Sequence, residues 1–410
     1  VYHLSYPSGA FTNTGGDVSY VGTAYTFDSL RIDYQLWAWG FNGVGALGQN
    51  SIGDTNASPV QVPGLAWANI AQCGANQGYN TLAVKTDGTL WGWGSNQQGE
   101  LGLNSIRAWI NGYSSPTQVG SSTNWSKDAN TMHLTVSGNY NSAAIKTDGT
   151  LWTWGGAQTN GNLGLNDRAK RSSPTQIPGT TWKGIDMAGQ LGTATKTDGT
   201  LWTWGQGTYG KLGQNSTVSY SSPVQIPGTT WDICASSTYG GAATKTDGTL
   251  WSWGYNQNGG QLGQNNRTNY SSPVQIPGTT WAIVKGGASC FLATKTDGTL
   301  WGWGDNGSRQ LGQGNGSLNA TSKVQYSSPV QIPGTTWPTN LKDLILNHAT
   351  SGAIKTDGTL WLWGNNFYGA TTHPSTAQWG PGSANQVPGN DWYKIGGGNT
   401  HTTALKKIES

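Results

Sequence analysis

Carboxylates are the first candidates for chemistry, because paired carboxylates can act as general acid and base. Of the 19 acidic residues, six occupy the same place in a repeated Lys-Thr-Asp-Gly-Thr-Leu segment: Asp87, Asp148, Asp198, Asp247, Asp297 and Asp357. Asp followed by Gly favours a tight turn, in which the carboxylate binds nearby backbone groups. We therefore expect a structural turn role for these six aspartates.

The other reactive side chains form no recognisable catalytic or metal-binding pattern. The five histidines are scattered along the chain at His3, His133, His348, His373 and His401. The three cysteines have no Cys-x-x-Cys spacing, so they suggest buried thiols rather than a zinc site. No Gly-x-Ser-x-Gly, phosphate-loop or calcium-loop signature occurs. The sequence predicts a protein that is not an enzyme, with no catalytic residues, no bound metal and no cofactor.

Tryptophan marks an internal repeat that must position everything else. The tetrapeptide Trp-x-Trp-Gly occurs seven times, at intervals of 49 to 61 residues, starting at Trp37, Trp91, Trp152, Trp202, Trp251, Trp301 and Trp361. A third tryptophan recurs between the copies, and only Trp109 and Trp379 fall outside this pattern. Repeats of about 50 residues are typical of solenoids and of propeller blades.

Each repeat is predicted to contain four short strands. The Asp-Gly pair between apolar residues predicts a two-residue hairpin with a type I′ turn. In the segment 300–304 the two indoles lie two residues apart, hence on one face of a strand. The segment Ser-Pro-Val-Gln-Ile-Pro-Gly at 272–278 carries prolines, which an edge strand tolerates.

The two ends of the chain hold complementary halves of a repeat. The C-terminal segment 392–408 contains the first two strands, and the N-terminal segments 34–40 and 58–64 supply the other two. Completing one sheet from both ends would remove the open edges of a ring. We therefore predict an all-β fold: a seven-bladed β-propeller of four-stranded antiparallel blades over residues 34–408, with the closing blade shared between the termini. A stacked, open solenoid is the alternative.

The repeat resembles a known family. The segment 245–263, Lys-Thr-Asp-Gly-Thr-Leu-Trp-x-Trp-Gly followed by Gln-Leu-Gly, is similar to repeats of the regulator of chromosome condensation family, and its near-identical copies suggest a bacterial or viral member. The resemblance implies a seven-bladed propeller with a split closing blade. Family members include a guanine-nucleotide exchange factor and a bacterial inhibitor of β-lactamases. Many family repeats place His five residues before the hairpin Lys, which here only His401 does, and no basic tail is evident. Exchange activity is therefore not expected.

Spacing indicates which side of the ring is free to vary. The distance from hairpin Lys to motif Trp is six in all six copies, and the distance from the Ser-Pro proline to the next Trp is eight or nine. The distance from motif Trp to the Ser-Pro proline varies from 21 to 28. From the third Trp to the hairpin Lys it is 14 in four units, but 18, 21 and 18 after Trp67, Trp125 and Trp337. We expect all of this variation to lie on one face, where binding loops are commonly found.

Aromatic residues gather in the connections expected on that face. The partner-binding candidates are Trp109, Tyr113, Trp379, Tyr368, Phe367, Tyr209, Tyr255 and Tyr140. Rigid aromatic anchors among Ser, Gly and Asn are typical of binding surfaces. The alternative is that individual rings cap blade ends or pack against neighbouring loops.

Composition narrows the partners. No apolar run is long enough for a membrane helix, and the formal net charge of +3 comes without a Lys/Arg cluster. We expect a protein or cell-surface glycan partner, no nucleic acid and no membrane insertion. Residues 1–33 are predicted to be an extended arm, able to join subunits, or the remnant of a preceding segment.

These observations together lead to a functional expectation. We expect a recognition or structural module located outside the cell or on a virion surface, such as a fibre, spike or decoration protein. The alternative is a soluble inhibitor or regulator of one protein.

Overall fold

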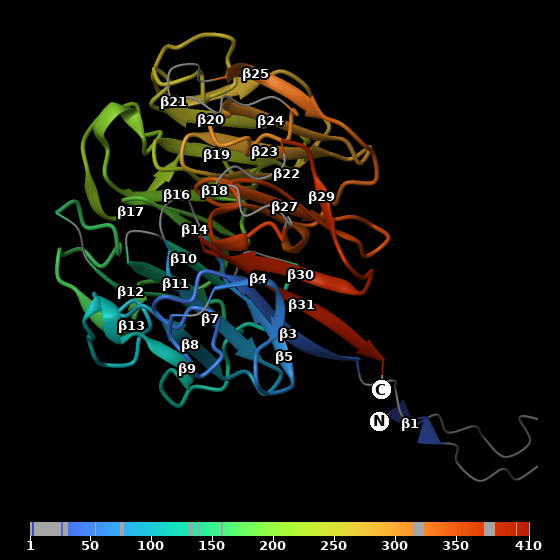
Figure 1. The fold of residues 1–410 in the computed structure, drawn as a ribbon. Coiled ribbons are helices and arrows are strands. Elements are labelled where there is room, and N and C mark those ends of the chain that lie inside the picture. Colours follow the sequence, from blue (N-terminus) through green and yellow to red (C-terminus); the bar gives the residue numbers. More distant parts are fainter. Residues whose placement is uncertain are drawn as a thin grey trace, which may run out of the picture.

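The chain forms a ring of seven four-stranded antiparallel blades in a computed structural model (Figure 1). Two of the blades are joined through the short strand β6 (Gln72–Cys73), which pairs in parallel with β10 (Leu134–Ser137) and β30 (Trp392–Gly397). The structure describes residues 2–3, 26–27, 32–53, 55–73, 78–130, 134–137, 140–156, 159–314, 324–372, 382–398 and 400–409. In these residues the helices are single 3₁₀ turns: η1 (Trp109–Asn111), η2 (Thr208–Gly210), η3 (Leu341–Asp343) and η4 (Phe367–Gly369). The predicted all-β, seven-bladed propeller is confirmed.

Each blade runs from an innermost strand at the axis to an outermost strand at the rim. Blades 1 and 2 comprise β5 (Trp67–Ile70) with its continuation β6 (Gln72–Cys73), β7 (Asn80–Lys85), β8 (Leu90–Gly94) and β9 (Tyr113–Gln118), then β10 (Leu134–Ser137), β11 (Asn141–Ile145), β12 (Leu151–Gly155) and β13 (Arg171–Ile177). Blades 3 and 4 comprise β14 (Trp182–Ala188), β15 (Leu191–Lys196), β16 (Leu201–Gly205) and β17 (Tyr220–Ile226), then β18 (Trp231–Ser236), β19 (Gly240–Lys245), β20 (Leu250–Gly254) and β21 (Tyr270–Ile276). Blades 5 and 6 comprise β22 (Trp281–Gly286), β23 (Cys290–Lys295), β24 (Leu300–Asp305) and β25 (Gln325–Ile332), then β26 (Leu344–Leu346), β27 (Thr350–Ile354), β28 (Leu360–Gly364) and β29 (Asn385–Val387).

Blade 7 closes the ring with strands from both ends of the chain. It comprises β30 (Trp392–Gly397), β31 (His401–Glu409), β3 (Ile32–Gly40) and β4 (Asn56–Gln61). The blue strand β3 lies beside the red strand β31 in Figure 1, and their pairing runs from Ile32 opposite Glu409 to Gly40 opposite His401. The predicted split closing blade is therefore confirmed. The short strands β1 (Tyr2–His3) and β2 (Thr26–Phe27) pair with each other.

Buried tryptophans join neighbouring blades. The second Trp of the motif is fully buried in each blade, as in Trp253. In six blades its indole N–H donates to a backbone carbonyl of the preceding blade, at 3.0 Å from Trp253 to Lys211. Trp303 of blade 5 has no such partner, and its ring stacks on Phe291 with centroids 5.9 Å apart. The residue between the two tryptophans is Gly, Ala, Ser or Thr in six blades and the larger Leu362 in blade 6.

The hairpin between the second and third strands differs from the predicted turn type. In blade 3, Gly199 alone has a positive φ (77°), and the N–H of Lys196 donates to Thr200 O at 3.0 Å across a three-residue loop. The Asp198 carboxylate accepts hydrogen bonds from the N–H (3.0 Å) and hydroxyl (2.7 Å) of Thr200. The two-residue type I′ turn is therefore wrong, because these side-chain bonds hold a longer loop in which only Gly must be left-handed.

The connections fall on two opposite faces. The turn face carries the hairpins between second and third strands and the links to the next blade, residues 197–200 and 227–230 in blade 3. The loop face carries the turns between first and second strands and the long connections between third and fourth strands, residues 189–190 and 206–219 in blade 3.

Length variation is not confined to the loop face. In blade 3, Ile185 follows Trp182 by three residues and pairs with Ala194. The equivalent residue follows by nine in blade 2 (Leu134, opposite Ala144) and by seven in blade 6 (Leu344, opposite Ala353). The extra residues of blades 2 and 6 therefore precede the inner strand and lie on the turn side. The expectation that all variation lies on one face is wrong, because a spacing between two landmarks does not say on which side of the strand residues are inserted.

Candidate partner-binding face

Three blades contribute to a first aromatic cluster on the loop face: Phe41, Tyr79, Trp109 and Tyr368. The Phe41 ring lies 4.7 Å from Tyr368 and 5.6 Å from Tyr79 between ring centroids, and Tyr79 meets Trp109 edge-on at 4.6 Å. Burial, Tyr368 and Tyr140 together raise the pKa of Tyr79 above its usual value. The cluster joins connections of blades 6, 7 and 1 into one continuous aromatic surface.

Blades 3 and 4 form a second aromatic cluster, consisting of Tyr209, Tyr239 and Tyr255. The Tyr255 ring lies 4.8 Å from Tyr209 and 5.5 Å from Tyr239. The Lys211 ammonium lies 5.5 Å from the Tyr239 ring centroid and donates to Gln206 Oε1 at 2.8 Å. Burial lowers the pKa of Lys211 to about 8.

Tyr209 and Tyr368 share an unusual geometry. They sit one residue before the Gly of equivalent 3₁₀ turns, η2 and η4, and both have a left-handed φ of 62°. Both are also exposed, at 51% and 42% of their surface. A left-handed backbone costs a bulky residue roughly 1–2 kcal/mol relative to the right-handed form. Exposed, strained aromatic residues of this kind are candidates for function rather than for packing.

The remaining predicted contact residues have different surroundings. Trp109 and Tyr255 are half-buried within the two clusters, and Tyr140 is half-buried with a φ of 65° between β10 and β11. Tyr113 begins the outer strand β9, where the Arg107 guanidinium lies 3.7 Å from its ring centroid and its hydroxyl lies 3.0 Å from Ser105 Oγ. Trp379 lies outside the described residues, as does the side chain of Phe367.

Sequence reasoning missed Phe41 as a member of the first cluster. Phe41 directly follows the motif Gly40, as Tyr255 follows Gly254. Aligning the residue after each motif glycine would have shown that blades 4 and 7 alone carry an aromatic side chain there.

Cations accumulate in the long connections of blades 1 to 5. They are Arg107, Arg168, Lys170, Arg171, Lys211, Arg267 and Arg309. The described acids there are Glu100, Asp167 and Asp305. Asp167 pairs with Arg171. Glu100 is buried, and this burial raises the pKa of its carboxyl. The described parts of the long connections in blades 6 and 7 carry no Lys or Arg. This part of the surface is therefore positively charged, although the chain as a whole is nearly neutral.

Within the described residues, no three His, Cys, Asp or Glu side chains lie close enough to hold one metal ion. His401 is fully buried in blade 7, 3.0 Å from Thr81 Oγ1 of blade 1, and burial lowers its pKa to about 4. Among the described residues, the helices are single 3₁₀ turns, and none of them is long and apolar enough to cross a membrane.

Comparison with known proteins identifies the repeats. The family described as regulator of chromosome condensation (RCC1) repeat matches residues 87–144, 148–189, 198–238 and 247–293. Yeast RCC1 (Prp20), solved bound to Kap60, superposes with a TM-score of 0.75 over 95% of each chain at 17% identity. Prp20p from Saccharomyces cerevisiae, studied for its binding to Gsp1p and histones, gives 0.72 over 92% of each chain at 17% identity. Four of the repeats, within residues 87–293, thus match the regulator of chromosome condensation repeat.

Curated relatives match shorter segments. The ultraviolet-B receptor UVR8 of Arabidopsis thaliana is 26% identical over 166 residues, 40% of this chain and 35% of that protein. The mitochondrial RCC1 domain-containing protein RUG3 of the same plant is 34% identical over 133 residues, 32% of this chain and 27% of that protein. A human relative, the probable E3 ubiquitin-protein ligase HERC6, is 29% identical over 149 residues, 36% of this chain and 14% of that protein. The matches thus span about a third or less of these relatives.

These relatives correct the functional expectation. A receptor, a mitochondrial protein and a ubiquitin ligase carry the same repeats, and none is a fibre, spike or decoration protein. The expectation of a structural fibre, spike or decoration protein is therefore wrong. The expected glycan partner gains no support from these relatives. The predicted bacterial or viral origin and the location outside the cell stay predictions.

Proposed function

We propose that this propeller of regulator of chromosome condensation repeats is a binding scaffold that recognises a protein partner through its loop face. The observation that carries the proposal is the pair Tyr209 and Tyr368, exposed and left-handed at equivalent positions of blades 3 and 6. Each belongs to an aromatic cluster, so its ring is held in place before a partner arrives. Rigid aromatic anchors lose little conformational freedom on binding.

The charge of the neighbouring connections indicates the chemistry of the partner. Exposed cations occur in the long connections of blade 1 (Arg107), blade 2 (Arg168 and Lys170) and blade 4 (Arg267), on the same face as the clusters. Charge complementarity increases the rate of encounter and suppresses wrong partners. The partner therefore presents acidic groups beside an apolar patch that receives the tyrosines.

The relatives support protein recognition without naming the partner. The complex of yeast RCC1 with Kap60, and the binding of Prp20p to Gsp1p and histones, are properties of those proteins. At 17% identity the likeness supports the fold alone, so no contact residue carries over. The scaffold has no catalytic centre of its own in this proposal, and its activity is to bind and position.

The proposal is tested by quantitative capture of proteins from the native source with Tyr209→Gly/Tyr368→Gly as bait. Gly suits the left-handed backbone, so the double variant removes the rings without disturbing the turns. We expect a specific partner of the wild type to be lost from the variant, and to be released from the wild type by raised salt. Thr230→Ala, on an exposed link of the turn face, is the matched control and should keep the partner. Equal capture by wild type and double variant contradicts the proposal.

A further inference from the structure

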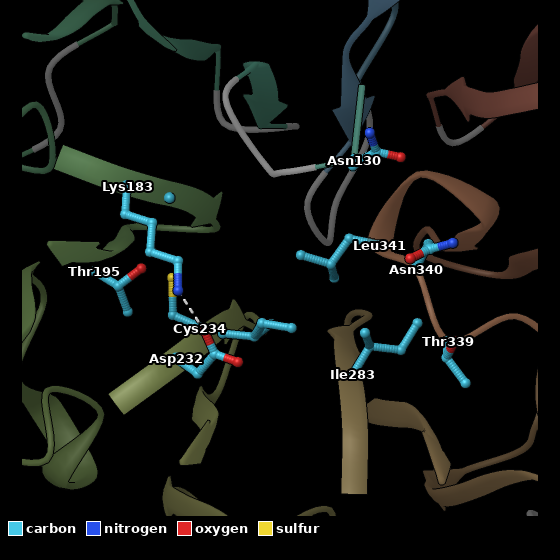
Figure 2. A pocket seen from close by; sticks show the side chains of 11 residues that line it. Asn130, Lys183, Thr195, Asp232, Cys234, Ile283, Thr339, Asn340 and Leu341 are labelled. Carbon is cyan, nitrogen blue, oxygen red and sulfur yellow. Dashed lines mark hydrogen bonds and ion pairs between the residues drawn. The ribbon is translucent and has the colours of Figure 1, made fainter. Parts of the chain in front are cut away.

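The departures from the repeat converge on the turn side of the propeller axis. Asn130, which precedes β10, and residues 339–341, which precede β26, line one cavity there together with the first residues of β14, β18 and β22 (Figure 2). The cavity has a volume of about 180 Å³. The strands and turns that recur in every blade are explained by the fold. The inserted segments of blades 2 and 6 do not recur, so their meeting at one cavity requires a separate explanation.

One wall of the cavity carries an ion pair. Lys183 and Asp232 stand second in the inner strands of blades 3 and 4, and Figure 2 shows the ammonium directed at the carboxylate. The equivalent residues of blades 1 and 5 are Ala68 and Ala282. Both charged side chains are partly open to solvent, at 40% and 34%. An ion pair this exposed contributes only about 0–1 kcal/mol, so separating the two charges costs little.

The other walls of the cavity consist of apolar side chains and of asparagine carboxamides. Ile233 and Ile283 line the cavity from β18 and β22, and Leu341 of η3 covers it from the opposite side, with Asn130 and Asn340 alongside. The cavity therefore presents a positive group, a negative group and an apolar surface within one small space.

Both covering segments are anchored to a buried polar plug on the axis. The Gln72 carboxamide donates to Leu341 O at 3.0 Å and accepts from the Lys285 ammonium. The buried Lys394 ammonium donates to Ala129 O at 3.1 Å. These hydrogen bonds fix the segments that bear Asn130 and Leu341.

The thiol in the cavity wall contributes no covalent chemistry. Burial raises the pKa of Cys234 to about 12, and its sulfur lies 3.5 Å from Thr193 O as a hydrogen-bond donor. A protonated thiol is neither a nucleophile nor a metal ligand. The cavity is therefore suited to reversible binding.

We propose that this cavity binds a small zwitterion with an apolar side chain, namely a free aliphatic α-amino acid. Its carboxylate pairs with Lys183, its ammonium pairs with Asp232, and its side chain packs against Ile283 and Leu341. Binding replaces one solvent-screened pair by two charge-assisted hydrogen bonds, which are stronger than neutral ones. A purely anionic or cationic ligand can pair with only one of the two protein charges. The site lies on the turn side, apart from the aromatic clusters, so it is independent of the proposed partner binding.

Isothermal titration of the full chain with L-leucine tests the proposal. We expect binding by the wild type, and at least about tenfold weaker binding of 4-methylpentanoate, which lacks the ammonium, and of isoamylamine, which lacks the carboxylate. Asp232→Asn and Lys183→Met should weaken leucine binding to a similar extent. Asp167→Asn removes an ion pair in a blade 2 connection and is the matched control. No binding of leucine, or equal affinity of wild type and Asp232→Asn, overturns the proposal.

A change of specificity separates a binding role from a structural one. Leu341→Ala enlarges the cavity without touching the ion pair, so it should raise the affinity for phenylalanine relative to leucine by about tenfold, the scale at which pocket shape discriminates apolar groups. A loss of folding would reduce both affinities together. An unchanged ratio of the two affinities shows that the amino acid does not bind beneath Leu341 and overturns the placement.

Discussion

The two faces of the ring use the same repeat in opposite ways. On the turn face, six blades place the same hairpin, in which the Asp carboxylate binds Thr and the Thr hydroxyl accepts the indole N–H of the first motif Trp, at 2.8 Å from Trp202 to Thr200. On the loop face, equivalent positions carry Tyr209 and Tyr368 in blades 3 and 6 but Gln98 in blade 1. Uniformity therefore marks the interactions that build the fold, and divergence marks those available for recognition.

The hairpin lysines belong to the uniform set. The Lys196 ammonium lies 4.6 and 4.5 Å from the ring centroids of Trp182 and Trp202, and the same sandwich recurs at the six hairpins. Cation–π contacts of partly exposed groups stabilise modestly, by about 0.5–1 kcal/mol each. These contacts explain why each of the six hairpins carries a Lys, and no bound ligand is needed to explain it.

Removing a core indole should produce the largest difference in stability loss between positions repeated in every blade and positions that differ between blades. Trp253→Ala deletes a fully buried ring and its hydrogen bond to Lys211 O, so the free energy of unfolding should fall by about 3–5 kcal/mol. Trp109→Ala, on the loop face, should cost less than about 1 kcal/mol. Urea denaturation measures both changes, and comparable losses would show that the loop-face aromatics are part of the core.

The plug between the faces should make stability depend on pH. Burial lowers the pKa of Lys394 to about 7 and of Lys285 to about 8, below the ordinary lysine value. The unfolded chain therefore binds more protons than the folded chain above pH 7, so stability rises with pH. We expect a gain of about 2 kcal/mol between pH 7 and 8.5.

Lys394→Met is the control for this pH dependence. It removes the largest pKa difference among the buried lysines Lys394, Lys285 and Lys211, so about half of the slope should disappear while the far-ultraviolet spectrum stays unchanged. A slope equal to that of the wild type, measured by chemical denaturation at each pH, would rule out the buried lysines as its source.

The strained tyrosines should show a smaller effect of opposite sign. Tyr209→Gly relieves a left-handed backbone at an exposed site, although Gly also raises the entropy of the unfolded chain. We expect thermal stability to rise by the equivalent of about 0.5 kcal/mol or to stay unchanged, while partner affinity falls. Tyr209→Ala, which keeps the strain, is the matched variant. A clear loss of stability in Tyr209→Gly would mean that the ring holds the fold.

The smallest expected effect concerns a single hairpin lysine. Lys196→Met keeps the packing of the side chain but removes the cation, so unfolding should become easier by about 0.5 kcal/mol. The same substitution at Lys170, exposed in a blade 2 connection, should leave stability unchanged. Parallel thermal melts compare the two variants, and equal effects would remove the distinction between repeated and divergent lysines.

The sequence was sufficient for the architecture because the blade-forming signals are local and repeated. The motif tryptophans, the Asp-Gly hairpins and the half-repeats at both ends predicted the strands and the ring. The turn type was missed, since the bonds from Asp198 to Thr200 outweigh the preference of the Asp-Gly pair alone.

Features created by distant residues could not be predicted in this way. Gln72 and Lys285 are 213 residues apart and meet only because the ring closes. Lys183 and Asp232 are similarly brought together by neighbouring inner strands. The candidate tyrosines were found because they stand in connections, but their strained backbone and clustering become visible only in the structure.

Site-specific photocrosslinking is the most direct test of recognition by the loop face. A photoreactive phenylalanine analogue is placed at Tyr255, within the second aromatic cluster, or at Thr197, in a hairpin of the turn face, and irradiated in extract of the native source. The account predicts one protein crosslinked from Tyr255, lost at high salt and in the presence of excess unlabelled wild type, and no such product from Thr197. The same product from Thr197 alone, or in equal yield from both positions, would contradict it.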